Sequence, residues 1–311
     1  MITIAYLFFW EENLKEEYYF TSFIRHHFGE VKTVDVNDNP DILLVSVLGG
    51  NINLVKDYKA KIKLFFTGEN TSYNPYHHQF DDDNVLKENF DIIVGFKYNN
   101  VRFPLWVSYY KYLDYKEDED NILKHLQESY DKNVKKEKKF LTTLLSHNNS
   151  FQNNFRPYLY NLMLKYAPVI CASTLFNNYP IIGNLTSEKI DHISQSVFNI
   201  CPENSHGEGY ITEKVIHALE AGTIPIYWAS EYPETNIINK NKYIFCDPNN
   251  IEKLEKTIDD AVKNEDIRQT YLKGDLFTKD AGIHIKKFYD DLKNNIKHQL
   301  DEKNISYVLR N

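Results

Sequence analysis

The sequence predicts an α/β protein with two Rossmann-like domains. Short apolar runs rich in β-branched and aromatic residues recur along the chain, they alternate with amphipathic stretches, and the pattern restarts after a charged segment at 114–139. Continuous apolar runs are typical of strands buried on both faces of a parallel sheet, and their alternation with helices indicates βαβ units. A chain of 311 residues is also long enough for two domains of ordinary size.

The first half supplies the first series of elements. Residues 2–9 are apolar but short, lack a basic flank and run into two glutamates, so they predict a buried strand and not a signal peptide or membrane anchor. A helix is expected over 12–28. Further strands are expected at 31–36, 42–47, 62–66 and 92–96.

Charged residues dominate the segment between the two halves. The candidates for burial within it are Ile122, Leu123, Leu126 and Tyr130. We therefore expect an exposed, partly helical linker that ends near Lys139. Its KKEKK run predicts a solvated face, with nucleic-acid contact as the alternative, because Glu137 interrupts a very short basic run.

The second half repeats the alternation. Strands are expected at 140–145, 169–172, 197–201, 224–228 and 243–245, and helices at 156–166, 213–221, 251–273 and 285–300. The predicted domains are residues 1–138, with the linker at the end, residues 139–283, and a C-terminal helix over 284–311.

Composition excludes several classes of protein. Lys and Arg number 36 and Asp and Glu 44, so the net charge is −8, which disfavours a broad nucleic-acid surface but allows a local basic pocket. No apolar run approaches the roughly 20 residues that span a bilayer, so we expect a cytoplasmic protein without an integral membrane segment. Three cysteines, Cys171, Cys201 and Cys246, predict no disulfide framework, and their places in expected strands favour buried, unreactive thiols.

Residues 198–230 are the most informative stretch. An expected strand leads into a polar loop with glycines, and a helix then begins near Thr212, whose hydroxyl is a suitable N-cap, and ends at Gly222. The start of such a helix favours an anion. Lys214 in its first turn opposes the helix dipole unless an anion such as a diphosphate is bound.

Two neighbours of Lys214 fit the same ligand. Glu213 is placed to accept hydrogen bonds from ribose hydroxyls, and Tyr210 to contact the nucleotide. The residues alone leave a second interpretation open, which is an ordinary βαβ turn with a surface Glu-Lys pair, because Gly-x-Gly loops are weak signals.

Four stretches resemble signatures of the α1,3/α1,4-fucosyltransferase family, the first of them closely. They are residues 201–228, with the runs CPENS, GYITEK and AGTIPIYW; residues 66–70 (FTGEN); residues 91–110, where an Arg precedes Pro-Leu; and residues 146–162, where Ser-His-Asn precedes Arg156. They occur in the family's order. The resemblance implies a GT-B arrangement of two domains facing a cleft, with the last helix crossing back to the first domain. It places the acceptor sugar in the first domain and GDP-fucose in the second.

The resemblance also implies a role for each matching residue. Glu69 resembles the general base that removes the acceptor's proton in an inverting displacement, with Glu203 as the second candidate. The residues that resemble donor-binding positions are Arg156, Tyr210 and Lys214 for the diphosphate, Glu213 for the ribose, and Glu203, Asn204 and Thr212 near the phosphate or fucose. The candidate acceptor contacts are Asn70 and Arg102. The family's second basic residue before the signature has no counterpart around Asn177, Asn178 and Gly183.

The expected activity is transfer of L-fucose from GDP-fucose to the 3-OH of a GlcNAc- or Glc-type residue in a glycan. The alternatives are another nucleotide sugar on the same fold, or a non-catalytic nucleotide- or carbohydrate-binding homologue. No cofactor is required, and a divalent metal is expected at most to stimulate, since Lys214 and Arg156 supply positive charge. The acidic run Asp81–Asp83 and the pair His77–His78 are interpreted as a solvated loop, not a metal site.

Overall fold

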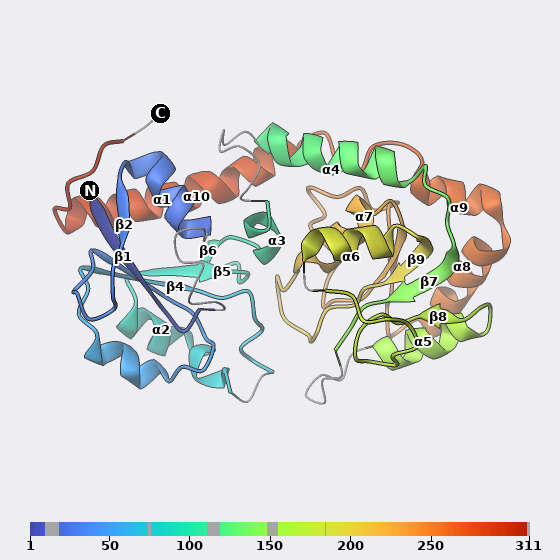
Figure 1. Ribbon diagram of the computed structural model, residues 1–311, viewed down its shortest axis with the longest axis horizontal. Coiled ribbons are helices and arrows are strands. Elements are labelled where there is room, and N and C mark those ends of the chain that lie inside the picture. The colour runs from blue at the N-terminus through green and yellow to red at the C-terminus, as the bar shows by residue number, and fades with distance from the viewer. Residues whose placement is uncertain (10–18, 74–75, 111–118, 148–154, 184, 310–311) are drawn as a thin grey trace. The chain divides into compact units, whose positions relative to one another are not determined.

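Two compact units make up the chain. The computed structural model describes residues 1–9, 19–73, 76–110, 119–147, 155–183 and 185–309. Unit 1 comprises Met1–Glu117 and Lys286–Asn311, and unit 2 comprises Asp118–Ile285. Each unit has its own parallel sheet and its own helices (Figure 1). The predicted α/β class with two parallel-sheet domains is therefore confirmed.

Unit 1 contains a six-stranded parallel sheet in the order β2-β1-β3-β4-β5-β6. Its strands are β1 (Ile2–Leu7), β2 (Val31–Thr33), β3 (Ile42–Val45), β4 (Ile62–Phe66), β5 (Ile92–Gly95) and β6 (Val101–Arg102). Its helices are α1 (Tyr19–Phe28), α2 (Asp83–Asn89) and α3 (Leu105–Ser108), with 3-10 turns at Ile52–Asp57 and His78–Phe80. Each expected strand is confirmed, and β6 is additional. The expected helix at 12–28 is confirmed from Tyr19, while residues 12–18 lie outside the described residues.

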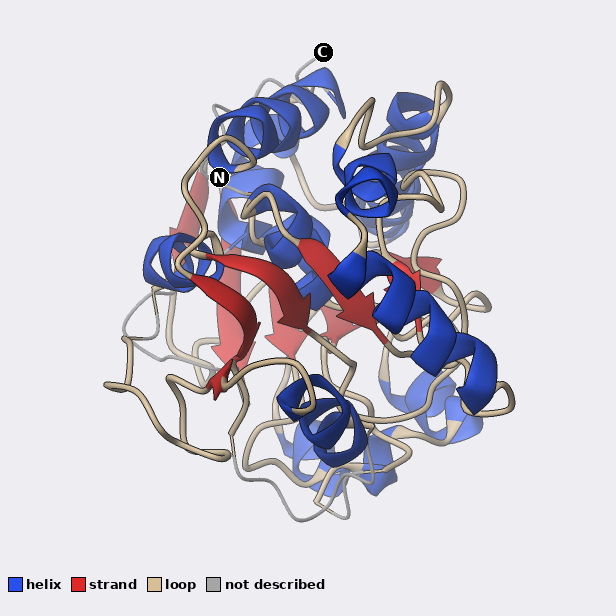
Figure 2. Cartoon of the chain, turned by 90° about the vertical axis from the view of Figure 1, so that its right-hand side faces the viewer, coloured by secondary structure: helices blue, strands red, loops and turns tan. Residues whose placement is uncertain are grey.

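Unit 2 contains a five-stranded parallel sheet in the order β11-β10-β9-β7-β8. Its strands are β7 (Phe140–Leu144), β8 (Val169–Ile170), β9 (Ser196–Ile200), β10 (Ile224–Tyr227) and β11 (Ile244–Phe245). Its helices are α4 (Glu119–Asn133), α5 (Arg156–Leu164), α6 (Thr186–Ile193), α7 (Glu213–Glu220), α8 (Ile251–Lys263) and α9 (Glu265–Leu272). Helices lie on both sides of the strand layer (Figure 2), and α5 and α8 bury their apolar residues against one face of it.

The charged segment before β7 is partly helical, as predicted, and Ile122, Leu126 and Tyr130 are buried as expected, but the segment is not an exposed linker. It forms α4, whose buried Ile122, Leu126 and Tyr130 recur every four residues and make one apolar face. This helix packs against α7. Gly222 has a φ of +63°, and a Cβ there would lie 2.3 Å from the backbone nitrogen of Val134. The unit boundary consequently falls after Glu117, and not at the expected residue 138.

One lysine of the basic KKEKK run after α4 holds backbone groups of unit 2 together. The Nζ of Lys138 donates to the carbonyl oxygens of Asn133, Ser194 and Gly222, at 3.2, 2.9 and 2.9 Å, which lie at or next to the ends of α4, α6 and α7. A cation at helix C-termini is favoured by their dipoles. Burial lowers the pKa of Lys138 to about 8. At least this lysine of KKEKK therefore joins helices of unit 2 instead of lying on a solvated face.

Two other expectations change. The single helix expected over 251–273 is two helices, because Asn264 ends α8 and its side chain accepts hydrogen bonds from the backbone nitrogens of Asp266 and Ile267 to begin α9. Helix α6 was not expected, because it has only 8 residues and one apolar pair, Ile190 and Ile193. Its omission matters because α6 contributes to the candidate site.

The last helix, α10 (Ala281–Glu302), passes from one unit to the other, and from Lys286 onward it belongs to unit 1. Tyr289 packs edge-on against Phe103, and Lys303 forms an ion pair with Asp91 at 3.3 Å. The prediction that the C-terminal helix packs on the first domain is therefore confirmed. No helix in the described part of the chain is long and apolar enough to cross a membrane.

Candidate functional site

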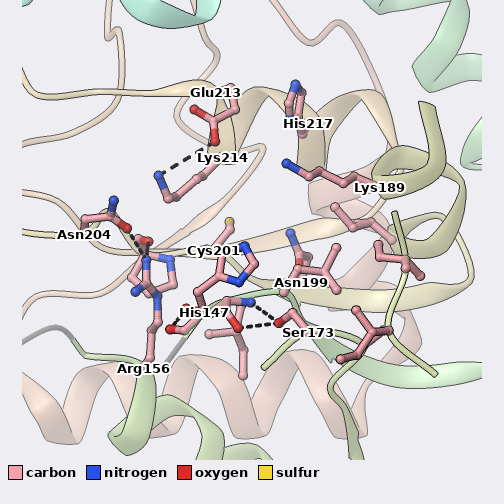
Figure 3. Close-up of a pocket in the computed structure, with 18 of the residues that line it drawn as sticks. His147, Arg156, Ser173, Lys189, Asn199, Cys201, Asn204, Glu213, Lys214 and His217 are labelled. Carbon is pink, nitrogen blue, oxygen red and sulfur yellow. Dashed lines mark hydrogen bonds and ion pairs between the residues drawn. The ribbon is translucent and has the colours of Figure 1, made fainter. Parts of the chain in front are cut away.

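A cavity of about 290 Å³ lies in unit 2 at the carboxyl ends of β7 and β9. The chain runs from β7 to β8 on one side and then crosses back to β9 on the other, so the strand order reverses between β7 and β9. Ligands of open parallel sheets bind outside the carboxyl ends of the strands at such a reversal. Residues that follow β7 and β9 line the cavity, together with residues of α5, α6 and α7 (Figure 3).

Positive charge dominates the cavity wall. Its charged side chains are Arg156, Lys189, Glu213 and Lys214. Three cations and one carboxylate in a chain of net charge −8 make this a local basic pocket, as the sequence allowed. A concave basic site favours an anionic ligand because its walls concentrate the field.

Arg156 begins α5 and is 5% exposed. Its Nη2 donates to the Oδ1 of Asn204 at 2.6 Å and to the carbonyl oxygen of Pro202 at 3.2 Å. These bonds fix the guanidinium against the loop that follows β9, and Arg156 and Asn204 lie together at one end of the cavity (Figure 3). Burial lowers the pKa of Arg156, but a guanidinium remains charged at neutral pH.

Glu203 is completely buried and does not line the cavity. Its carboxylate accepts hydrogen bonds from the backbone nitrogen and hydroxyl of Thr212 at 2.8 and 2.7 Å. It also accepts from the Tyr227 hydroxyl at 2.9 Å and from the Nζ of Lys214 at 3.2 Å. Because a carboxylate has about four acceptor positions, these bonds satisfy it. Glu203 therefore anchors the start of α7, which argues against a direct donor contact and against its role as base.

The same network changes our interpretation of Thr212. Its backbone occupies the N-cap position of α7, but its side chain makes no capping bond. The hydroxyl donates to Glu203 and lies 2.9 Å from the Nζ of Lys214. The anion that offsets Lys214 near the helix start is thus a carboxylate of the protein itself. Thr212 and the buried Tyr210 do not line the cavity, so direct contacts of these two with the donor stay predictions.

Glu213 and Lys214 do line the cavity, while their contacts with the donor stay predictions. Their charged groups are 3.8 Å apart. Burial alone would lower the pKa of Lys214, but the carboxylates of Glu203 and Glu213 outweigh it and raise this pKa above its ordinary value. Burial alone would raise the pKa of Glu213, but the charge of Lys214 outweighs it and the net shift is downward. Both groups are therefore charged at neutral pH.

Sequence reasoning missed the end of the cavity opposite Arg156. Lys189 from α6, Asn199 from β9 and His217 from α7 gather there (Figure 3). His217 lies one helical turn after Glu213, a spacing that could have identified it. Burial lowers the pKa of His217, so its ring is neutral at pH 7. Lys189 is a basic residue six positions after Gly183, and the family's second basic residue has no counterpart around Asn177, Asn178 and Gly183.

The predicted base lies in unit 1. Glu69 follows β4 and is half-buried, and its backbone nitrogen donates to the hydroxyl of Thr67 at 2.9 Å. A Cβ at Gly68 would lie 2.6 Å from the side chain of Leu105, so this turn has little room for a larger residue. The buried Asn70 accepts from the backbone nitrogen of Ser72 at 3.2 Å. These bonds hold the loop that presents Glu69.

Arg102, the other predicted acceptor contact, lies in β6. Its guanidinium donates to the carbonyl oxygen of Phe96 and lies 4.6 Å from the ring centroid of Tyr98 and 5.9 Å from that of Phe288. It therefore supports the turn after β5 and contacts α10. A contact between Arg102 and an acceptor stays a prediction.

The acidic run has a different role from the solvated loop that we expected. Asp82 caps α2 by accepting from the backbone nitrogens of Asn84 and Val85. Lys97 forms ion pairs with Asp81 and Asp83 at 3.0 and 3.4 Å. Among the described residues, no group of three or more His, Cys, Asp or Glu side chains is placed to hold a metal.

The three cysteines are unpaired and buried, as predicted. Each follows a strand of unit 2, and Cys201 lines the cavity. Burial raises the pKa of Cys171 to about 11, and it also raises the pKa values of Cys201 and Cys246 above the ordinary value of a thiol. The thiols are therefore protonated and unreactive at neutral pH.

Comparison with known proteins agrees with the motif resemblance. Residues 134–303, which are more than half of the chain, match the family model described as glycosyltransferase family 10 (fucosyltransferase), C-terminal part. The α-(1,3)-fucosyltransferase FucT of Helicobacter pylori is 26% identical over 224 residues, which are 64% of this chain and 44% of that protein. The match thus spans less than half the length of this relative.

Solved structures share the fold over almost the whole chain. A crystal structure of an α1,3-fucosyltransferase has a TM-score of 0.69 at 20% identity, and the alignment covers 95% of this chain and 90% of that one. A structure of an α1,3-fucosyltransferase with GDP-fucose has a TM-score of 0.65 at 20% identity, with the same coverage. Anabaena HepE in complex with UDP and glucose has a TM-score of 0.51 at 8% identity, with coverage of 97% and 100%.

Proposed function

The chain belongs to glycosyltransferase family 10, and on this premise we propose that it is an inverting fucosyltransferase that uses GDP-fucose. The observation that carries the proposal is the basic cavity at the strand-order reversal of unit 2, where Arg156, Glu213 and Lys214 meet. Arg156 and Lys214 bind the diphosphate, and Glu213 accepts hydrogen bonds from the ribose. A relative of known structure at 20% identity holds GDP-fucose, which supports this choice of donor.

The reaction is a single displacement. The acceptor hydroxyl oxygen forms a bond to the anomeric carbon of fucose, and the bond from that carbon to the phosphate oxygen breaks. Glu69 takes the hydroxyl proton, and GDP leaves with the electron pair. Arg156 and Lys214 stabilise the negative charge that develops on the diphosphate, so no metal is assigned to this step. The acceptor is a glycan, with the 3-OH of a GlcNAc- or Glc-type residue as the proposed nucleophile and Asn70 and Arg102 as proposed contacts.

The donor-site assignment is tested by calorimetric titration of GDP into three variants. Arg156→Met and Lys214→Met each remove one charge-assisted contact, so GDP affinity should fall by about 10- to 100-fold. Lys263→Met is the matched control, because this lysine lies on α8 and is 66% exposed. The affinity of this variant for GDP should equal that of the unchanged protein. Unchanged affinity in both cavity variants would refute the assignment. A melting curve for each variant shows that it is folded.

A further inference from the structure

The end of the cavity opposite Arg156 has polar groups that the displacement does not use. We propose that Lys189 and Asn199 form a nucleobase subsite there, and that Lys189 makes it selective for a purine with an oxo group at C6. This inference rests on the proposed function, because it assumes that a nucleotide occupies the cavity.

Lys189 supplies a donor that faces the cavity. It lies on α6, which packs on both α7 and β9, and its side chain lines the cavity. Within the described residues its ammonium has no hydrogen-bond or ion-pair partner, in contrast to that of Lys214. Its charge is close enough to Glu213 to affect the pKa of that residue. A half-buried cation of this kind is suited to an acceptor group on a ligand.

Asn199 supplies an acceptor at the same end. It lies near the end of β9, is 3% exposed and lines the cavity. Its Oδ1 is buried and makes no hydrogen bond in the described structure. A buried carbonyl without a donor costs about 1–3 kcal/mol, so this amide is expected to meet a hydrogen-bonding ligand.

Apolar side chains also line the cavity. Ile182 and Ile193 line the cavity from the segments before and within α6, and Ile200 lines it from β9. Apolar walls with a few polar groups are typical of sites that bind flat rings. A nucleobase has apolar faces for such walls and a polar edge for Lys189 and Asn199.

The ammonium of Lys189 and the side-chain oxygen of Asn199 match the polar edge of guanine better than that of adenine or a phosphate group. Guanine presents the acceptors O6 and N7 to a lysine, and its ring N–H and amino groups are donors for the Asn199 oxygen. Adenine places an amino group where guanine has O6, so the ammonium would face a donor. A phosphate group has no donor for Asn199, and Arg156 and Lys214 already lie at the other part of the cavity.

Binding of GDP, ADP and inorganic pyrophosphate to Lys189→Met tests the subsite. GDP affinity should fall by about 10- to 100-fold, the usual effect of losing one charge-assisted bond. ADP and pyrophosphate affinities should change by less than about twofold, because neither ligand offers the C6 oxo group. Lys189→Arg keeps a donor and should retain most of the preference for GDP over ADP. Lys263→Met should leave all three affinities unchanged.

The result separates this subsite from its alternatives. If Lys189→Met lost affinity equally for all three ligands, Lys189 would contact phosphate. If the ratio of GDP to ADP affinity stayed the same, Lys189 would not contact the nucleobase. Either outcome overturns the subsite while leaving the proposed function in place. Failure of the unchanged protein to bind GDP would overturn the proposed function and the subsite together.

Discussion

In unit 1 the loop that follows β4 carries a carboxylate, Glu69, whereas in unit 2 the loops and helices beyond β7 and β9 bring Arg156 and Lys214 to one cavity. Both units present these groups at the carboxyl ends of parallel strands. In unit 1 the nearby charges pair with one another, as Lys97 does with Asp81. In unit 2 the cavity keeps an excess of positive charge.

The two units show how similar parallel sheets can present different charged groups. The strands of both sheets are apolar and buried, and they serve to place the loops. The loops then determine whether a unit presents a carboxylate, as in unit 1, or a basic cavity, as in unit 2. The proposed function predicts that a change at Glu69 in unit 1 lowers transfer but leaves GDP binding intact. Changes at Arg156 or Lys214 in unit 2 should instead lower GDP binding.

The largest expected effect is on turnover through unit 1. Glu69→Gln removes the proposed base without changing its size, and transfer should fall by about 10²- to 10⁴-fold. GDP affinity should stay the same, because Glu69 is not part of the unit 2 cavity. Fucose transfer and calorimetry measure the two properties.

The control for this variant is Glu88→Gln, an exposed change on α2 of the same unit, which should leave turnover unchanged. If Glu69→Gln kept most of the transfer activity, the base would have to be another residue.

An intermediate effect is expected from the buried carboxylate of unit 2. Glu203→Gln removes the negative charge that Lys214 contacts, and the free energy of unfolding should fall by about 3 kcal/mol. GDP affinity should fall too, because Glu203 positions Lys214 and the start of α7. Urea unfolding and calorimetry measure these changes.

Glu208→Gln lies in the same loop but is exposed, so it should change neither property. A Glu203→Gln protein as stable as its Glu208→Gln control would show that the network does not stabilise unit 2.

The smallest expected effect is a pH dependence in unit 2. A hydrogen bond from His125 to Glu220, at 3.2 Å, raises the pKa of His125 above 6.5. This stabilisation is complete below the unfolded pKa of 6.5 and is lost as the pH rises through the higher folded pKa. The ring is 37% exposed, so the effect should be below about 1 kcal/mol.

Urea unfolding of His125→Asn measures this effect. The loss of stability relative to the unchanged protein should be larger at about pH 5.5 than at about pH 8.5. His298→Asn is the control in unit 1, because its ring is 75% exposed and lies 3.9 Å from Glu302, and it should show almost no pH-dependent change. Equal losses at both pH values for His125→Asn would contradict the assignment of this pair.

The sequence was most informative about elements whose own residues are buried. The strands were predictable because each is an apolar run with polar ends, and α10 because its apolar stripe is long. The buried residues of α4 were identified from the sequence, but its many charges favoured an exposed linker, and only the contact of α4 with α7 shows what those apolar residues pack against.

Motifs identified cavity residues in the stretches that resemble the family, such as Arg156, Glu213 and Lys214. They could not separate residues that line the cavity from residues that support it. Glu203 is in the signature, but its carboxylate binds Thr212 and Tyr227, which are 9 and 24 residues away in the chain. These hydrogen bonds hold it outside the cavity lining, and the sequence alone does not show them. Lys189 was missed because α6 is too short for its apolar pattern to be recognised.

A donor screen with the unchanged protein tests the central claim most directly. GDP-fucose, GDP-mannose and UDP-sugars would be offered one at a time with an array of glycan acceptors, and release of the nucleotide and glycosylation of the acceptor would be measured. The account predicts acceptor-dependent release of GDP from GDP-fucose, with fucose on the product. Preferred transfer from another sugar nucleotide, or binding of GDP without transfer to any acceptor, would contradict it.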